Sequence, residues 1–259
     1  MKYSIDMKNT RYSWRHRRTL GLHFLKSERI ARKIVDYADI TPGDVVLEIG
    51  PGKGILTKIM LERGAKVIGI EKSPHLYGYL KERFREYIES GKFVLINDDA
   101  LRVDFSSLEF NKVVSNLPYS ISSQITLKLF KEKFQKGILM YQRDFAERIA
   151  NVPPREKFNR LAAIVYFLAE VRILFVVKAK YFQPPPKVDS AVVEVTPKNA
   201  DIPEGFEDFL RILFSQPRKK LKNVLKNTLS FGNMRPEDLS PEDMLKLFNA
   251  NKKCLDFYK

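Results

Sequence analysis

The sequence has almost none of the residues that build disulfides or transition-metal centres. Cys254 is the one cysteine in 259 residues, which excludes an internal disulfide and a metal site made of clustered cysteines. The three histidines, His16, His23 and His75, do not have the spacing of metal ligands. We therefore expect no bound metal.

Long hydrophobic runs are also missing. The longest uninterrupted run, residues 161–169, is far too short to cross a bilayer. The first 18 residues contain no apolar stretch of the kind that a secretory signal requires. These two absences predict a soluble cytoplasmic protein that does not associate with membranes.

Acidic residues are under-represented, because 31 Asp and Glu stand against 46 Lys and Arg, for a formal charge of +15. A chain this basic is expected to bind a polyanion, most often nucleic acid. The charge is concentrated in residues 1–35, with ten basic and two acidic residues, and in residues 217–226, with five basic residues and no acid. The residues in these two runs that are predicted to contact nucleic acid are Arg15, Arg17, Arg18, Arg218, Lys219, Lys220 and Lys222.

Hydrophobic residues make up 44% of the sequence, which is enough to form a substantial core. Short apolar runs at 44–50, 65–71, 92–98, 111–116 and 137–142 predict strands, and helical patterns at 53–64, 73–91 and 122–134 lie between them. This alternation predicts an α/β fold with a doubly wound parallel sheet that is covered on both faces. Strands at 171–179 and 189–197, joined without a helix, should add an antiparallel hairpin at the sheet edge.

The pattern changes after Pro197. Short amphipathic helices are expected at 206–214, 218–229 and 240–250, separated by Pro, Gly and Asn. We therefore divide the chain into an α/β domain, residues 1–198, whose residues 1–20 form a basic arm, and a small helical domain, residues 199–259, whose basic run is expected to contact nucleic acid.

A glycine-rich loop, LEIGPGKGILT, follows the first strand and opens a helix, which is where open α/β sheets bind ligands. Its glycines, Gly50, Gly52 and Gly54, do not have dinucleotide spacing, because Ile55 stands where the third small residue belongs. The loop also lacks the Gly-Lys-Ser/Thr of a phosphate-binding P-loop. Glycines at such a position allow a ligand to approach the backbone closely.

Polar side chains follow the next three strands. Glu71 comes 21 residues after Gly50, where a carboxylate can accept both ribose hydroxyls, and Asp98 and Asp99 could accept from an adenine amine. Asn116 ends the fourth strand, in the turn NLPY. A cofactor with a ribose, an adenine and no phosphates fits this series best. S-adenosylmethionine is such a cofactor, and the glycine spacing disfavours NAD.

The motifs GLHFL, LEIGPGKGILT, NDDAL, NLPYSISS, QRDFAERIA and FQPPPKVDSAVV occur in this order between residues 17 and 226. In this combination the chain resembles the ribosomal RNA adenine dimethyltransferases of the KsgA type, which are similar to the erythromycin-resistance rRNA methyltransferases. The resemblance implies a Rossmann-like, S-adenosylmethionine-dependent methyltransferase. Its implied activity is N6-dimethylation of two adjacent adenosines in a hairpin of small-subunit rRNA, within an immature ribosomal subunit, by a monomer.

Carried over residue by residue, the resemblance assigns the target site and the cofactor site. Asn116 and the Leu117 carbonyl would meet the target amine, Pro118 would fix the turn, and Tyr119 and Phe182 would cover the two faces of the base. The implied cofactor-binding residues are His23, Leu25, Gly50, Gly52, Glu71, Lys72, Asp99, Ala100 and Asn116.

Two positions depart from the family pattern. Leu22 replaces a glutamine, which removes one side-chain hydrogen bond to the cofactor, and Pro217 replaces the first of two arginines in the basic C-terminal motif. Two other readings stay open: a DNA N6-adenine methyltransferase, and a non-catalytic RNA-binding assembly factor on the same scaffold. The intact set of Gly50, Glu71, Asp99 and Asn116 argues against lost catalysis.

Overall fold

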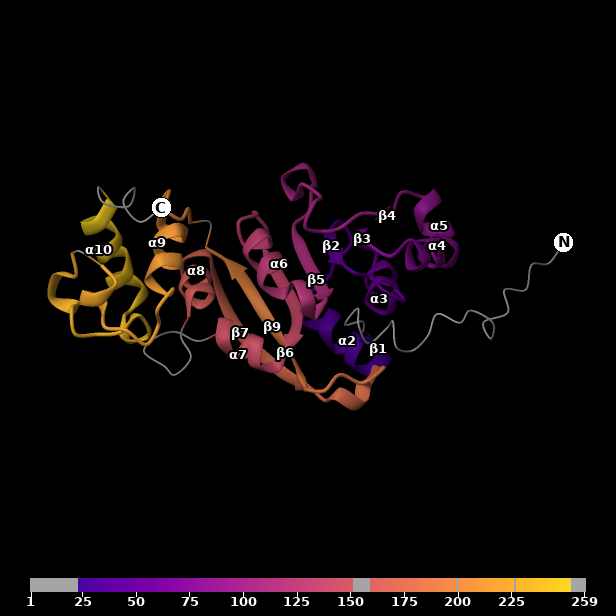
Figure 1. Ribbon diagram of the computed structural model, residues 1–259. Coiled ribbons are helices and arrows are strands. Elements are labelled where there is room, and N and C mark those ends of the chain that lie inside the picture. The colour runs from indigo at the N-terminus through magenta and orange to yellow at the C-terminus, as the bar shows by residue number, and fades with distance from the viewer. Residues whose placement is uncertain (1–22, 151–158, 199, 226, 253–259) are drawn as a thin grey trace.

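A seven-stranded sheet forms the centre of the protein (Figure 1). The computed structural model describes residues 23–150, 159–198, 200–225 and 227–252. The strand order is β4-β3-β2-β5-β6-β9-β7. The strands are β2 (Val45–Ile49), β3 (Lys66–Ile70), β4 (Phe93–Ile96), β5 (Lys112–Asn116), β6 (Lys136–Gln142), β7 (Ala169–Val177) and β9 (Ser190–Pro197). The first five strands in this order run parallel, and β9 is antiparallel to both β6 and β7. The predicted α/β fold with its edge hairpin is confirmed.

Helices cover both faces of the sheet. Neighbouring residues of a strand point to opposite faces, so each strand contributes to two separate hydrophobic clusters. On β2, Val46 packs with one hydrophobic cluster and Leu47 with another. The Val46 cluster includes α2 (Glu28–Tyr37), α3 (Ile55–Glu62) and α4 (Pro74–Arg83). The Leu47 cluster includes α6 (Ser122–Leu129), α7 (Arg143–Ile149) and α8 (Arg160–Leu168). Near-continuous apolar strands are therefore required.

The helix expected over 73–91 is interrupted at Phe84, so that prediction is wrong in part. Ser73 caps α4 as a serine before a first-turn proline should, and accepts from the backbone N–H of Leu76. The chain then leaves helical geometry at Phe84 and resumes as α5 (Arg85–Glu89). Phe84 is buried edge-on against Phe93, with ring centroids 5.6 Å apart, and this packing fixes the break.

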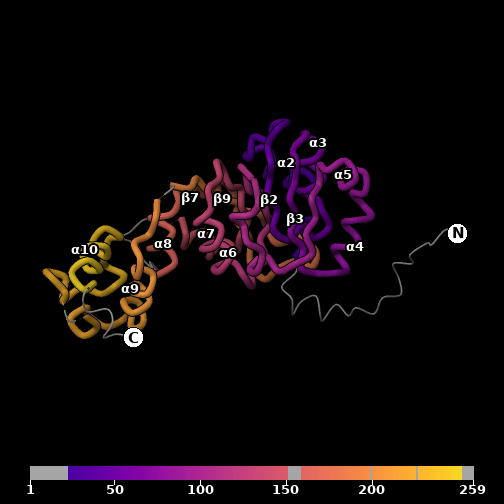
Figure 2. Tube along the Cα trace, turned by 90° about the horizontal axis from the view of Figure 1, so that it is seen from above, coloured from indigo at the N-terminus to yellow at the C-terminus, as the bar shows by residue number. Residues whose placement is uncertain are grey.

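The C-terminal region contains α9 (Phe206–Leu213) and α10 (Pro241–Asn251), which together with α8 form one end of the molecule (Figures 1 and 2). The prediction of a helix over 218–229, between these two, is wrong for the described residues. Short 3₁₀ turns stand there, η4 (Leu221–Asn223) and η5 (Leu229–Phe231), followed by η6 (Pro236–Asp238). The backbone N–H groups of Leu221 and Lys222 donate to Met234 and Gly232 instead of to a preceding helical turn.

A two-stranded ribbon that the sequence did not predict ties the N-terminal segment to the proline-rich loop. It pairs β1 (Phe24–Leu25) antiparallel with β8 (Phe182–Gln183), next to the 3₁₀ turn η3 (Ala179–Tyr181). The pairing aligns Phe24 with Gln183 and Leu25 with Phe182. Two-residue strands have no detectable alternation, so no pattern could have indicated them.

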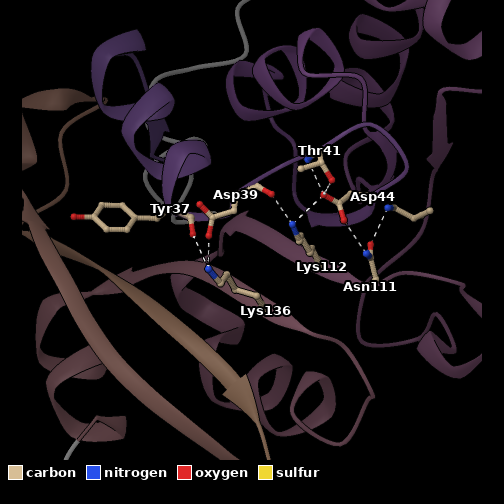
Figure 3. Close-up of polar contacts among 8 residues, drawn as sticks. Tyr37, Asp39, Thr41, Asp44, Asn111, Lys112 and Lys136 are labelled. Carbon is tan, nitrogen blue, oxygen red and sulfur yellow. Dashed lines mark hydrogen bonds and ion pairs between the residues drawn. The ribbon is translucent and has the colours of Figure 1, made fainter.

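The amino edge of the sheet carries a polar network (Figure 3). Lys112 Nζ donates to the carboxylate of Asp44, at 2.9 Å, and to the Asp39 carbonyl, at 2.6 Å. Asn111 and the backbone N–H of Thr41 donate to the same carboxylate. Burial opposes ionisation of Asp44, but these hydrogen bonds outweigh it and lower its pKa to about 2. The network therefore holds a charged carboxylate at a nearly buried position.

The described ranges lack two kinds of feature. No helix within them is long and apolar enough to span a membrane. No group of three or more His, Cys, Asp or Glu within them could hold a metal ion.

Candidate active site

The residues predicted to form a binding site lie at the ends of four neighbouring strands, at the carboxyl edge of the sheet and opposite the Asp44 network. In sheet order these are Asp99 after β4, Glu71 after β3, the glycine loop after β2 and Asn116 at the end of β5. Because the four strands are parallel, the series read along the sequence becomes one row in space.

The glycine loop lies against both the Asn116–Tyr119 turn and the N-terminal ribbon. Gly50 and Gly52 have φ values of 67° and 61°, the left-handed region that favours glycine. A Cβ at Gly50 would lie 3.4 Å from Pro118, and one at Gly52 would lie 3.0 Å from the Phe24 ring. The backbone conformation disfavours a side chain at both glycines, and at Gly52 the Phe24 ring also leaves little room for one.

Glu71 is buried at the mouth of this loop and is 5% exposed. One carboxylate oxygen accepts from the Gly52 N–H, at 3.1 Å, and the other from the Ser73 N–H, at 2.9 Å. Burial raises the pKa of Glu71, and these two hydrogen bonds oppose the rise. Each oxygen keeps a lone pair for a further donor.

Glu48, in the middle of β2, is a second buried carboxyl that the sequence reasoning missed. Its signal was an acid inside an otherwise apolar strand, VVLEI. Burial raises the pKa of Glu48 to about 8, and the charge of Glu71 adds to the rise. The Thr57 hydroxyl donates a hydrogen bond to the Glu48 carboxylate at 2.5 Å, which opposes the rise. At neutral pH the Glu48 carboxyl is mainly protonated.

Glu48→Gln is expected to reduce the pH dependence of stability between about pH 5 and pH 8. The folded protein keeps a proton on Glu48 that the unfolded chain, with a glutamate pKa of about 4.3, releases. The contribution of this proton to the free energy of unfolding is therefore complete below the unfolded-state pKa of about 4.3 and is lost as the pH rises through about 8. The glutamine variant does not titrate, so its free energy of unfolding in urea should fall less steeply, by up to about 1.4 kcal/mol per pH unit.

The control for this experiment is Glu89→Gln, at an exposed position on α5. It should reproduce the pH dependence of the unaltered protein. If Glu48→Gln did so as well, the buried carboxyl would not be protonated in the folded state.

Asp99 lies in a turn after β4 and is held on two sides. One oxygen accepts from Lys72 Nζ at 2.8 Å and the other from the Leu101 N–H at 3.0 Å. The hydrogen bond from Lys72 is the main cause that lowers the pKa of Asp99. Ala100, the next residue, is buried. Asp99 is therefore a fixed, ionised acceptor.

Asn116 has one half of its amide satisfied and the other half free. Its Nδ2 donates to the His23 carbonyl at 3.2 Å. Its Oδ1 is buried and has no hydrogen-bond partner, and it is the one such side-chain atom among the described residues. Buried polar atoms are nearly always paired, so an unpaired acceptor at this edge points to a missing donor.

The turn after Asn116 has a fixed shape. Leu117 is buried and its N–H donates to the Met140 carbonyl, while Pro118 leads into η2 (Tyr119–Ile121). The Tyr119 hydroxyl lies 2.6 Å from Ser190 Oγ, and its ring stacks on His23 with centroids 5.7 Å apart. Burial raises the pKa of Tyr119, so its hydroxyl remains neutral.

The position of Phe182 does not match the predicted role. Phe182 is 1% exposed and, with Leu25, belongs to the hydrophobic cluster beneath the ribbon. The ribbon pairing turns both side chains into the core, so Phe182 offers no open face to a base and Leu25 offers no side chain to a ligand. The ring of His23, which precedes the ribbon, is held in place by its Nδ1, which lies 2.8 Å from the Pro184 carbonyl.

Two serines complete the bracing of this site and were not singled out from the sequence. Ser115 Oγ donates to the Ile49 carbonyl at 2.6 Å, which joins β5 to the start of the glycine loop. Ser190, on β9, is the partner of Tyr119. Ser190 lies inside the motif FQPPPKVDSAVV and Ser115 directly precedes the motif NLPYSISS, but nothing in their type or spacing indicated these contacts.

The predicted RNA-binding residues fall into two groups. Arg15, Arg17 and Arg18, like the departure at Leu22, lie outside the described residues. The other four, Arg218, Lys219, Lys220 and Lys222, are all exposed, and within the described part of the chain none forms an ion pair. Pro217 is also exposed. Buried Leu221 anchors this run between the lysines.

The sheet order and edge hairpin define a methyltransferase fold of the Rossmann-like class. A solved dimethyladenosine transferase from Plasmodium falciparum superposes with a TM-score of 0.77 at 29% identity, over 89% of this chain and 98% of that one. The 23S rRNA methyltransferase ErmE shares the fold, with a TM-score of 0.68 at 24% identity over 87% and 98% of the two chains.

Sequence comparison identifies the family. The ribosomal RNA adenine dimethylase family matches residues 14–251. A Methanosarcina acetivorans protein named probable ribosomal RNA small subunit methyltransferase A is 42% identical, over 89% of this chain and 92% of its own. A Ureaplasma parvum protein named ribosomal RNA small subunit methyltransferase A is 38% identical, over 89% and 91%. The chain belongs to the ribosomal RNA adenine dimethylase family.

Proposed function

We propose that this protein dimethylates N6 of two adjacent adenosines in a small-subunit ribosomal RNA hairpin, with S-adenosylmethionine as methyl donor. The observation that carries the proposal is the buried, unpaired Oδ1 of Asn116 at the carboxyl edge of the sheet. An exocyclic amine is a donor that this acceptor lacks. Family membership supports the same substrate class.

The set of hydrogen-bond acceptors at this edge fits a nucleoside without phosphates. Glu71 and Asp99 are carboxylates that can accept from ribose hydroxyls and from an adenine amine, and they would repel a phosphate. Gly50 and Gly52 keep the loop backbone open to a ligand. His23, Lys72 and Ala100 border these groups. S-adenosylmethionine, when bound, supplies an electrophilic methyl group on a sulfonium.

Asn116 and the Leu117 carbonyl activate the target amine. The N6 lone pair of adenine is delocalised into the ring, which makes the nitrogen a poor nucleophile. Hydrogen bonds accepted by Asn116 Oδ1 and the Leu117 carbonyl draw the nitrogen toward tetrahedral geometry and localise the pair. The N–H donation from Asn116 to His23 keeps Oδ1 aimed at the target, so positioning supplies much of the acceleration. The methylated nitrogen is acidic enough to release its proton to water afterwards.

The target base must leave its stack to reach this turn. Tyr119 offers a ring beside Asn116, and a base–aromatic stack contributes about 1–3 kcal/mol. Phe182 takes part only if the β1–β8 ribbon opens, because its ring is in the core. We therefore assign the base platform to Tyr119, with His23 behind it.

Charge reversal at Lys219 and Lys220 is expected to weaken binding of the rRNA hairpin by at least about tenfold. Each phosphate contact contributes about 0.7–0.9 to the slope of log affinity against log salt, so the slope should fall by about 1.5. Titration at several salt concentrations measures both quantities, and the affinity for S-adenosylmethionine should not change.

The control reverses the same amount of charge at Lys66 and Lys92, two exposed lysines at the amino edge of the sheet. The control should bind RNA nearly as well as the unaltered protein. If both variants lost RNA affinity equally, the loss would be explained by net charge alone, and residues 218–222 would not be part of the RNA interface.

The proposal includes the domain division at residues 198 and 199, a monomeric enzyme, and an immature ribosomal subunit in the cytoplasm as the natural substrate. Its test is incubation with labelled S-adenosylmethionine and either unmethylated small subunits or duplex DNA. Primer extension should then stop at two adjacent adenosines of the small-subunit rRNA. Transfer to DNA would favour the rival enzyme, and absence of both cofactor binding and transfer would leave a non-catalytic assembly factor.

A further inference from the structure

Lys128, near the end of α6, reaches across to the turn that follows β4. Its Nζ donates to three backbone carbonyls, those of Ala100 at 3.1 Å, Leu101 at 2.9 Å and Val103 at 2.5 Å. An ammonium group has three donors, and all three are used here. The same Nζ lies 4.5 Å from the centroid of the Phe105 ring. Lys128 is therefore a structural cation and not a solvated surface charge.

The three carbonyls converge because residues 99–103 form a tight turn. The N–H groups of Arg102 and Val103 both donate to the Asp99 carbonyl, at 2.8 and 3.2 Å. As at the end of a helix, the following carbonyls are left without backbone partners on one side, where a cation is favourable. Lys128 takes the place of those partners.

This turn is also the one that holds the predicted adenine contacts. Asp99 accepts from the Leu101 N–H within the turn, so the direction of its side chain depends on the shape of the turn. Lys128 belongs to the helix that follows the Asn116–Tyr119 turn. One side chain thus joins the adenine side of the edge to the helix beside the target turn.

We propose that Lys128 is a positioning residue for cofactor recognition: it fixes the 99–103 turn so that Asp99 and Ala100 read the amine edge of the adenine. This inference rests on the proposed function, because it takes the occupant of that edge to be an adenosyl group. It adds a residue from α6 to the recognition of a ligand that Lys128 itself does not touch.

The test compares the affinities of S-adenosylhomocysteine and S-inosylhomocysteine by calorimetry. The inosyl compound has a ring carbonyl where the adenosyl compound has the amine, so an acceptor at Asp99 should reject it. We expect the adenosyl preference of the unaltered protein to fall by about tenfold in Lys128→Met, which keeps the apolar stem over Phe105 and removes the three donors. An unchanged preference would overturn the inference.

Matched variants separate positioning from general damage. Lys133→Met removes a nearby exposed lysine and should leave the preference unchanged. In an Asp99→Asn background, Lys128→Met should have little further effect on the preference, because both act on one contact; an undiminished effect would contradict the inference. Lys128→Arg keeps the charge but cannot converge on three carbonyls with a planar group, so it should show an intermediate loss and provides the test if the methionine variant does not fold.

The proposed function fails in a different way. If the unaltered protein bound both compounds equally, the adenine-reading role of Asp99 would be rejected, and the role of Lys128 with it. A clear adenosyl preference that Lys128→Met leaves intact would reject the role of Lys128 alone.

Discussion

Asn116→Ala should lower methyl transfer to adenosine by about 100- to 1000-fold, the range found when one preorganised hydrogen-bonding group is removed from a reaction centre. The alanine variant lacks the buried Oδ1 that is free to accept from the amine. Its affinity for S-adenosylmethionine should stay within about twofold, because Gly50, Glu71 and Asp99 are unaltered. Single-turnover transfer and calorimetry measure the two quantities separately.

Asn116→Asp provides the comparison for this result. It keeps an acceptor oxygen but replaces the Nδ2 donor, so a second oxygen would face the His23 carbonyl. Transfer should therefore fall less than in the alanine variant, yet remain well below the unaltered protein. An equal loss of transfer and cofactor affinity in Asn116→Ala would contradict the role assigned to Asn116.

Lys112→Met should lower the free energy of unfolding by about 3–5 kcal/mol, the usual cost of removing one partner from a buried ion pair. The side chains of Lys112 and Asp44 are only 11% and 8% exposed. Without the lysine, Asp44 keeps its hydrogen bonds from Thr41 and Asn111 but loses the compensating charge, and the Asp39 carbonyl loses a donor. Urea denaturation at neutral pH measures the difference.

Two further variants define what this measurement means. Lys136→Met removes a lysine at the same edge whose nearer partner, Asp39, is 71% exposed and whose more distant partner, Glu194, keeps its ion pair with Arg172. This variant should cost about 1 kcal/mol or less. The double variant Asp44→Asn, Lys112→Met removes both charges and should be more stable than Lys112→Met alone. If the double variant were the less stable of the two, the cost would come from lost packing and not from an unpaired charge.

The sequence predicted the parts of the fold that repeat along the chain. Apolar strands alternate with helices through the first 150 residues, and parallel strands carry the residues at their ends to one edge. The order of Gly50, Glu71, Asp99 and Asn116 along one edge therefore follows from the sequence alone. Their roles toward a ligand remain predictions that the variants above test.

The remaining features depend on contacts between distant segments. Phe182 was expected at the target base, yet its pairing opposite Leu25 in the two-residue ribbon turns it into the core. The run 218–229 has helical spacing, yet long-range backbone bonds to residues 232–234 hold it as turns. Tertiary contacts outweigh local propensity in both places.

The partner of Asn116 has a consequence for the order in which the site is made. The His23 carbonyl orients the amide, and the His23 ring is in turn held by Pro184, 161 residues further along the chain. Closing a contact of this sequence separation comes late in folding. The strands β2, β3, β4 and β5 are all complete by residue 116, but the Asn116 amide can be held in this way only after Pro184 has been synthesised. A chain that ended before residue 184 would lack the carbonyl that holds the His23 ring, and the Asn116 amide would lose this support.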